Sequence, residues 1–139
     1  MLILGSGCGT VDLGTYEGVR DLRLDEDYYY CVIQPRVLTA KKCSSGEPGD
    51  SGGCHSSNSS YRLADIATPV NCASGKPTAL PSAEERANYG ASSLRVTRDP
   101  ESSPLLSKPT GKSGSTHKLV FDSSAAEAGL IRTWIGRTR

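Results

Sequence analysis

Apolar positions along the chain predict two principal helices, one in the first third of the sequence and one at its end. From Tyr28 onward, apolar residues recur at steps of three and four, at Tyr29, Val32, Ile33, Val37 and Leu38. This spacing predicts a helix that runs up to Cys43, and the acidic residues 25–27 are typical of its cap or first turn. Pro35 interrupts the run, so we expect the helix to begin near this residue or to kink there.

The last segment has the clearest helical pattern. Ser124 and Glu127 have the spacing of a capping box, which predicts the start of the helix. One apolar stripe follows, formed by Leu130, Ile131, Trp134 and Ile135. Gly136 and the flanking arginines mark the end. We expect this stripe to pack near the first helix, against Tyr29, Val32 and Leu38.

The chain between these helices predicts only short elements. A brief element spans residues 61–66, a loop spans 72–77, one or two helical turns span 83–88, and an extended piece spans 94–96. Residues 104–109 predict one helical turn that Pro109 stops. The connections are rich in Gly, Ser and Pro, so the pattern predicts a mostly α fold with long loops.

Length and composition indicate one domain with a sparse core. Of its 139 residues, 36% are hydrophobic and 6% aromatic. This is little apolar volume for a self-sufficient core, so disulfides or a cofactor are expected to supplement it. The 16 basic residues nearly balance the 15 acidic ones, which indicates no nucleic-acid-binding surface. No apolar run approaches the roughly 20 residues of a membrane-spanning helix.

The stretch from Cys43 to His55 carries the most specific chemical signal. Cys54 is followed directly by His55, and ten residues separate Cys43 from Cys54. Two cysteines with a histidine after the second are the pattern of a covalently attached haem, in which the thiols add to vinyl groups and the imidazole binds the iron. The usual spacer has two residues. The longer spacer here consists of small, turn-forming or acidic residues, which can loop outward.

The same stretch contains Gly-Asp-Ser51-Gly-Gly, which is similar to the nucleophile loop of chymotrypsin-type proteases. A serine nucleophile requires a histidine base and a carboxylate, and in that family both precede the serine. No histidine precedes His55 in this chain. The pattern therefore argues against a serine protease, and Ser51 is expected to be a loop residue.

A haem iron needs a second axial ligand or keeps an open site. Methionine is a common partner of histidine in electron carriers, but the single methionine is Met1, which is badly placed. The only other histidine is His117, which is therefore the expected second ligand. Two histidine ligands close the iron to substrates, which favours electron transfer over enzymatic oxygen or peroxide chemistry.

Two groups of residues resemble a bacterial family of c-type cytochromes. The first is Tyr30-Cys31-Val-Ile-Gln34-Pro35-Arg-Val-Leu38, which leads to Cys43 and then to Cys54-His55. The second is Asp99-Pro100-Glu-Ser-Ser103-Pro-Leu105-Leu106-Ser-Lys108-Pro109, followed by His117 and Leu130-Ile131-Arg-Thr-Trp134-Ile135. They are similar to the family's "Val-Gln-Pro-Ile-Leu" helix, its "Asn-Pro-x-x-Ser-x-Leu-Leu-x-Lys-Pro" turn, its distal histidine and its "Leu-x-x-Trp-Ile" last helix, in the same order.

The resemblance implies a small cytochrome c-like helical domain over residues 28–139, preceded by an N-terminal segment over residues 1–27. It implies one covalent haem c, attached through Cys43 and Cys54 and ligated by His55 and His117. The implied function is single-electron transfer with redox partner proteins, in the bacterial periplasm or as a subunit of a larger complex or haem polymer. Two features depart from the family pattern: the ten-residue spacer, and Lys118-Leu119 in place of the glycines that commonly follow the distal histidine.

The remaining cysteines leave alternatives open. Under the haem hypothesis Cys31 and Cys72 form a disulfide, which closes a loop of about 40 residues and contributes on the order of 3–4 kcal/mol. The other possibility is two separate thiols. Cys8 follows small residues, as a lipid-acceptor cysteine of a bacterial lipoprotein does, so it is either a site of membrane attachment or an ordinary thiol.

Two alternatives do without haem. One is a disulfide-stapled extracytoplasmic binding or structural module with no metal. The other is a structural zinc protein, with zinc held by Cys31, Cys43 and Cys54 together with His55 or Cys72. Zinc sites usually draw on close cysteine pairs with two intervening residues, and the chain contains no such pair.

Overall fold

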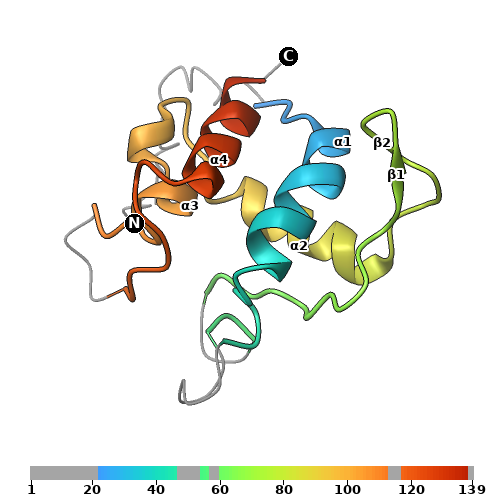
Figure 1. Ribbon diagram of the computed structural model, residues 1–139, viewed down its shortest axis with the longest axis horizontal. Helices are drawn as coiled ribbons and strands as arrows, with labels where there is room; N and C mark the ends of the chain where they lie inside the picture. The colour runs from blue at the N-terminus through green and yellow to red at the C-terminus, as the bar shows by residue number, and fades with distance from the viewer. Residues whose placement is uncertain (1–21, 47–53, 57–59, 113–116, 138–139) are drawn as a thin grey trace, which may run out of the picture.

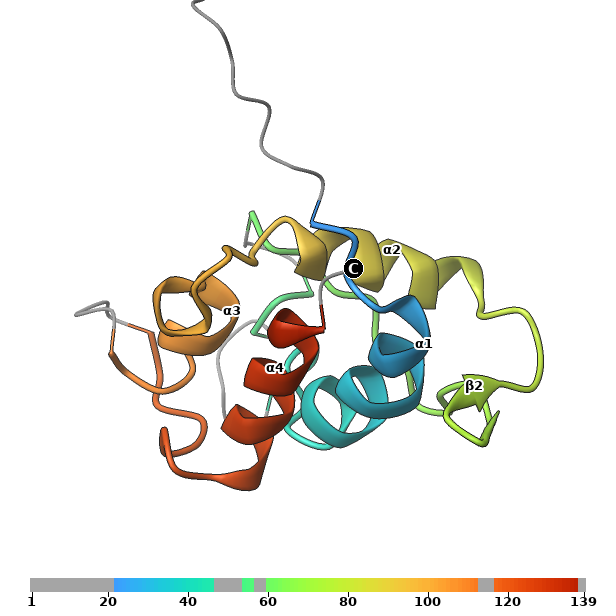
Figure 2. The same ribbon diagram turned by 90° about the horizontal axis from the view of Figure 1, so that it is seen from above.

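The computed structural model describes residues 22–46, 54–56, 60–112 and 117–137, and these form a small, mostly helical fold. A short helix, α1 (Glu26–Tyr28), continues directly into η1 (Tyr29–Thr39), and the last helix is α4 (Ala126–Gly136). These helices lie side by side, and α3 (Pro104–Ser107) lies on the other side of α4 (Figures 1 and 2). The prediction of a mostly α fold is confirmed.

The core joins the first and last helices through aromatic side chains. Tyr29 and Trp134 are fully buried, and their ring centres are 5.1 Å apart. The Trp134 indole N–H donates to the backbone carbonyl of Asp25 at 2.9 Å. The Asp25 side chain caps α1 by accepting from the Tyr28 N–H at 3.0 Å, as the acidic stretch predicts. The end of α4 and the start of α1 are therefore fastened together.

The first helix differs from the prediction in its start and in its register. It begins at Glu26 and passes through Pro35 as a π-helix, in which N–H groups bond to carbonyls five residues earlier. Buried residues consequently recur every four positions, as the pairs 29/30, 33/34 and 37/38. A normal α period would bury Val32, but Val32 is half-buried and Ile33 takes the core position. The helix ends at Thr39, and Cys43 lies in the turn that follows.

The last helix begins one residue later than its capping box requires. Its N-cap is Ala125, which makes no side-chain cap, so Ser124 precedes the cap and Glu127 falls one position too early. Glu127 pairs instead with Lys41 at 2.8 Å, which ties α4 to the turn after η1. The apolar stripe is confirmed for Ile131, Trp134 and Ile135, which are buried; Leu130 is half-buried against the core.

The middle of the chain contains more regular structure than the pattern predicts. Residues 72–77, expected as a loop, form a two-stranded antiparallel hairpin of β1 (Cys72–Ala73) and β2 (Lys76–Pro77). Ser74 and Gly75 both have positive φ, as the turn of such a hairpin requires. The expected short helix is α2 (Ala83–Ser93), of 11 residues, which begins at a capping box of Ser82 and Glu85.

Residues 94–109 lead from α2 into α3. The prediction of an extended segment at 94–96 is wrong. The backbone N–H groups of these residues donate to carbonyls of residues 90–93, so the segment is a turn. A short η2 (Pro100–Ser102) follows. The predicted single helical turn at 104–109 is confirmed as α3.

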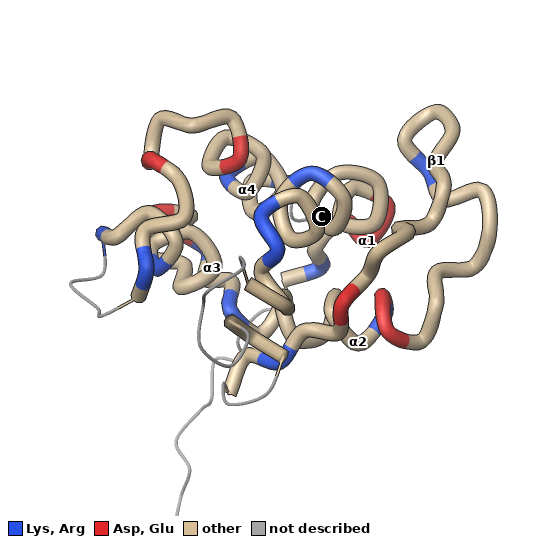
Figure 3. The backbone as a smooth tube through the Cα atoms, turned by 60° about the horizontal axis from the view of Figure 1, so that its bottom comes forward, with Lys and Arg blue, Asp and Glu red and all other residues tan. Residues whose placement is uncertain are grey.

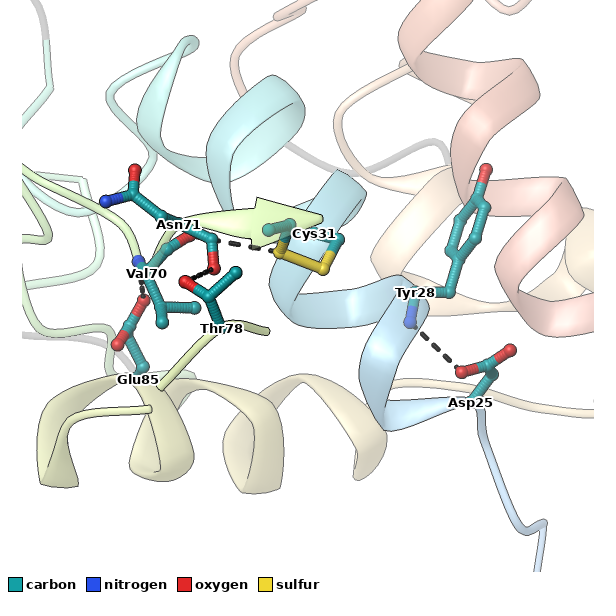
Figure 4. Close-up of a disulfide and its surroundings, with 8 residues drawn as sticks. Asp25, Tyr28, Cys31, Val70, Asn71, Thr78 and Glu85 are labelled. Carbon is teal, nitrogen blue, oxygen red and sulfur yellow. Dashed lines mark hydrogen bonds between the residues drawn. A yellow bond between two sulfur atoms is a disulfide. The ribbon is translucent and has the colours of Figure 1, made fainter. Parts of the chain in front are cut away.

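The disulfide between Cys31 and Cys72 is present and confirms that prediction. The two Cα atoms are 5.7 Å apart, and the bond joins η1 to the hairpin (Figure 4). The same region is tied to α2, because the Glu85 carboxylate accepts from the Val70 N–H at 2.7 Å. Cys8 and Ser51 lie outside the described residues. None of the helices in the described ranges has the length and apolar character that a membrane crossing needs.

Candidate functional site

A cavity of about 400 Å³ lies between η1, α3, α4 and the adjoining loops. Its walls are largely apolar and include Ile33, Val37, Leu105, Val120, Phe121 and Ile131. All four residues that the sequence assigned to a haem also line it: Cys43, Cys54, His55 and His117. The fold therefore gathers in one cavity the side chains that the sequence predicted to act together.

His55 is held through its backbone and its ring. Its N–H donates to the Ser44 carbonyl at 3.0 Å, and its own carbonyl accepts from the Leu63 N–H at 2.9 Å. The imidazole lies 4.8 Å from the Tyr61 ring, centre to centre, and makes a hydrogen bond to the Tyr61 backbone. Because that bond raises the pKa of His55, the ring donates to the Tyr61 carbonyl. The other ring nitrogen then has the lone pair that a metal can bind.

The protonation state of His55 suits a ligand. Burial lowers its pKa most, and electrostatic interactions with His117, Lys108 and Arg95 lower the pKa further. Together these effects exceed the increase in pKa that the hydrogen bond with the Tyr61 backbone causes. The imidazole is therefore neutral at neutral pH, which is the form that binds metals.

His117 is oriented by its neighbour in the chain. Its Nδ1 lies 2.7 Å from the backbone oxygen of Lys118. A carbonyl oxygen only accepts, so Nδ1 donates, and in the neutral ring the lone pair is on Nε2. This is the arrangement common in metal-binding histidines, whose second nitrogen donates to a carbonyl or carboxylate.

The two imidazoles lie at a separation that suits one metal ion. Their ring centres are 5.9 Å apart and their planes are inclined by 21°. Two imidazoles on opposite sides of one ion have ring centres roughly 6 Å apart, because each metal–nitrogen bond is about 2 Å long. The ring-centre separation of His55 and His117 is therefore compatible with two ligands on opposite sides of one ion.

The two thiols differ in burial. Cys43 is half-buried in the turn after η1, whereas Cys54 is exposed. Burial raises the pKa of Cys43 to about 12, with a smaller increase from Cys54 and a decrease from Lys41. The Cys43 thiol is therefore protonated at neutral pH and is a weak nucleophile by itself. Both thiols nevertheless open onto the cavity that the histidines line.

A haem fits this set of side chains better than a protein-ligated metal does. Within the described ranges, no three His, Cys, Asp or Glu side chains gather closely enough to hold a metal ion. A structural zinc takes four ligands from the protein, whereas a haem ring fills all but two positions of its iron. A covalently attached haem would use the two imidazoles as iron ligands, the two thiols for attachment of the ring and the apolar walls for its burial.

Sequence reasoning missed the residues that connect this site to the core. The Tyr61 hydroxyl lies 2.8 Å from Ser92 Oγ on α2, and Ser92 Oγ lies 3.2 Å from the Tyr29 hydroxyl on η1. Ser92 and Tyr29 are fully buried. Tyr61 is one of six tyrosines, and no local pattern sets it apart, because its role depends on contacts with distant segments.

Comparisons of the chain with models of protein families, with curated proteins and with solved structures find no match. The resemblance to c-type cytochromes therefore stays a prediction from the sequence motifs.

Proposed function

We propose that this chain is a single-electron carrier that holds one covalent haem c in the cavity, with His55 and His117 as axial ligands. The observation that carries the proposal is the pair of imidazoles 5.9 Å apart in an apolar cavity that two cysteine thiols also line. The resemblance of the flanking motifs to c-type cytochromes supports it independently.

Each side chain has a distinct part in this proposal. Cys43 and Cys54 form the thioether bonds, and the Tyr61 carbonyl holds the His55 ring in its orientation. The apolar walls exclude water from the bound group. Haem supplies an iron that alternates between Fe(III) and Fe(II). With a histidine on each side, no position is left for a substrate, so the proposed role is electron transfer and not catalysis.

The location and partners are part of the same proposal. The disulfide between Cys31 and Cys72 supports an extracytoplasmic location, because disulfides persist in oxidising compartments. We place the protein in the bacterial periplasm or outside the cell, with redox proteins as partners or as a subunit of a larger assembly. Membrane attachment through Cys8 stays a prediction.

The test is a reduced-minus-oxidised visible spectrum of the protein made in a host with haem-attachment machinery, followed by acid–acetone extraction. We expect sharp α and β bands and colour that stays with the precipitated protein. Cys43→Ala and Cys54→Ala, made singly, should each leave one thioether, and the double variant should release its haem into the solvent.

A colourless product from this host would overturn the proposal. Metal analysis would then separate the two alternatives, a structural zinc protein and a metal-free disulfide-stapled module. The zinc alternative draws on Cys31 and Cys72, which in this structure are joined to each other, and a disulfide sulfur is not a thiolate ligand.

A further inference from the structure

The cavity that would hold the haem is lined by an excess of positive charge. Among its described lining residues, four are basic and none is acidic; the basic ones are Lys41, Arg95, Lys108 and Lys118. Composition does not explain this excess, because the whole chain has 16 basic and 15 acidic residues. Acidic residues occupy the first turns of α1 and α2, whereas basic positions lie beside α3 (Figure 3).

Two of these cations have no carboxylate partner in the described part of the chain. Lys41 is paired with Glu127 at 2.8 Å. Outside the cavity, Lys112 and Arg132 are both paired with Glu101. By contrast, Arg95 and Lys108 form no ion pair within the ranges described. Their charges are therefore available to an anionic group in the cavity.

Arg95 is also held in place before any ligand arrives. Its guanidinium donates to Ser60 Oγ at 3.0 Å and lies 6.0 Å from the centre of the Tyr61 ring. Its backbone carbonyl accepts from the Leu105 N–H of α3 at 3.0 Å, and Lys108 is the C-cap of the same helix. A guanidinium fixed in this way loses little side-chain freedom on binding.

We propose that Arg95 and Lys108 form a carboxylate-binding subsite, which binds the two propionate groups of the haem and fixes the orientation of its ring. The inference rests on the proposed function and adds recognition of the ligand's charged edge. Haem carries its vinyl and propionate groups on different edges. Binding of the carboxylates at Arg95 and Lys108 would therefore favour one orientation of the ring in the cavity. Guanidinium–carboxylate pairs are among the strongest and most directional contacts available for this purpose.

The test compares two porphyrins whose propionate groups are either charged or esterified. The full chain with Cys43→Ser and Cys54→Ser cannot form thioether bonds and should bind porphyrin reversibly. Its affinity for ferric protoporphyrin IX is compared with that for the dimethyl ester by visible titration. The comparison is repeated with Arg95→Gln, with Lys108→Gln, with both, and with Arg95→Lys. Lys76→Gln is the matched control, because Lys76 is an exposed cation on β2 that does not line the cavity.

We expect esterification to weaken binding by roughly tenfold or more in the parent chain. In the double variant the two porphyrins should bind almost equally, and Arg95→Lys should restore part of the difference. The control should behave as the parent. Lys108 is exposed, so its substitution tests the subsite without threatening the fold.

If every Arg95 and Lys108 variant lost the same factor in affinity for the acid and for the ester, the carboxylate-binding subsite would be overturned and the haem assignment would stand. Failure of the parent chain to bind either porphyrin, together with a colourless product from the haem-attaching host, would overturn both proposals.

Discussion

The contact between Tyr61 and Ser92 provides a quantitative test of how the His55 loop is fastened to the core. The Ser92 Oγ is shared by two phenol hydroxyls, at 2.8 Å from Tyr61 and 3.2 Å from Tyr29. Tyr61→Phe removes one hydroxyl and keeps the ring that contacts His55. Ser92→Ala removes the atom that both hydroxyls share.

The expected costs follow from what each substitution leaves behind. In Tyr61→Phe, Ser92 keeps its contact with Tyr29, so the free energy of unfolding should fall by about 1 kcal/mol, the net value of one hydrogen bond. In Ser92→Ala both phenols lose a partner, although Tyr29 keeps its contact with the Gln34 amide oxygen at 3.3 Å. We expect that variant to lose about 2 kcal/mol. The double variant should lose about 1 kcal/mol less than the sum, because the shared contact is counted twice.

Urea unfolding followed by tryptophan fluorescence measures these values, since Trp134 is the single tryptophan and is fully buried. Tyr89→Phe is the matched control. It makes the same chemical change but removes a hydroxyl that bonds to the Leu24 carbonyl at 3.3 Å, so it should add to Ser92→Ala without coupling. Strict additivity of Tyr61→Phe and Ser92→Ala would refute the reasoning.

Three further predictions concern the distal ligand, the disulfide and acid stability. His117→Ala should convert the haem from low to high spin and let imidazole or cyanide bind, as read from the visible spectrum; an unchanged low-spin spectrum would show that His117 is not the ligand. Replacing Cys31 and Cys72 by serine should lower the free energy of unfolding by up to about 4 kcal/mol, because the bond spans 41 positions of sequence and restricts the unfolded chain. Urea unfolding of this variant should also show a larger m-value, and an unchanged midpoint would contradict the estimate. Hydrogen bonds from Arg132 and Lys112 lower the pKa of Glu101 from 4.5 to about 2. The contribution of Glu101 to the free energy of unfolding is therefore fully present above pH 4.5 and is lost as the pH falls toward 2. Glu101→Gln should make the free energy of unfolding fall less steeply between pH 4.5 and 2. An unchanged slope would show that other groups cause the loss of stability in acid.

Features that depend on a few neighbouring residues could be predicted from the sequence. The acidic cap at Asp25, the single turn at 104–109 and most of the α4 stripe follow local rules of capping, proline geometry and periodicity. Local rules gave the wrong position where another contact shifted a helix start or where the helix type changed the buried positions. The α4 cap moved by one residue while Glu127 paired with Lys41, and the π-helix shifted the buried face from Val32 to Ile33.

The candidate site divides in the same way. Residue types and their order along the chain were enough to nominate Cys43, Cys54, His55 and His117, because thiols and imidazoles have few other uses in such a pattern. The sequence alone could not determine that these four side chains meet in one apolar cavity, or that Tyr61, Ser92 and Arg95 belong to its surroundings. Those contacts join segments far apart in the sequence, and they form only because burial of the aromatic core between η1 and α4 brings the intervening loops together. The sequence by itself thus determined the chemistry that the chain can offer. The tertiary structure decided where that chemistry is concentrated, since non-local packing has no signature in any single stretch of residues.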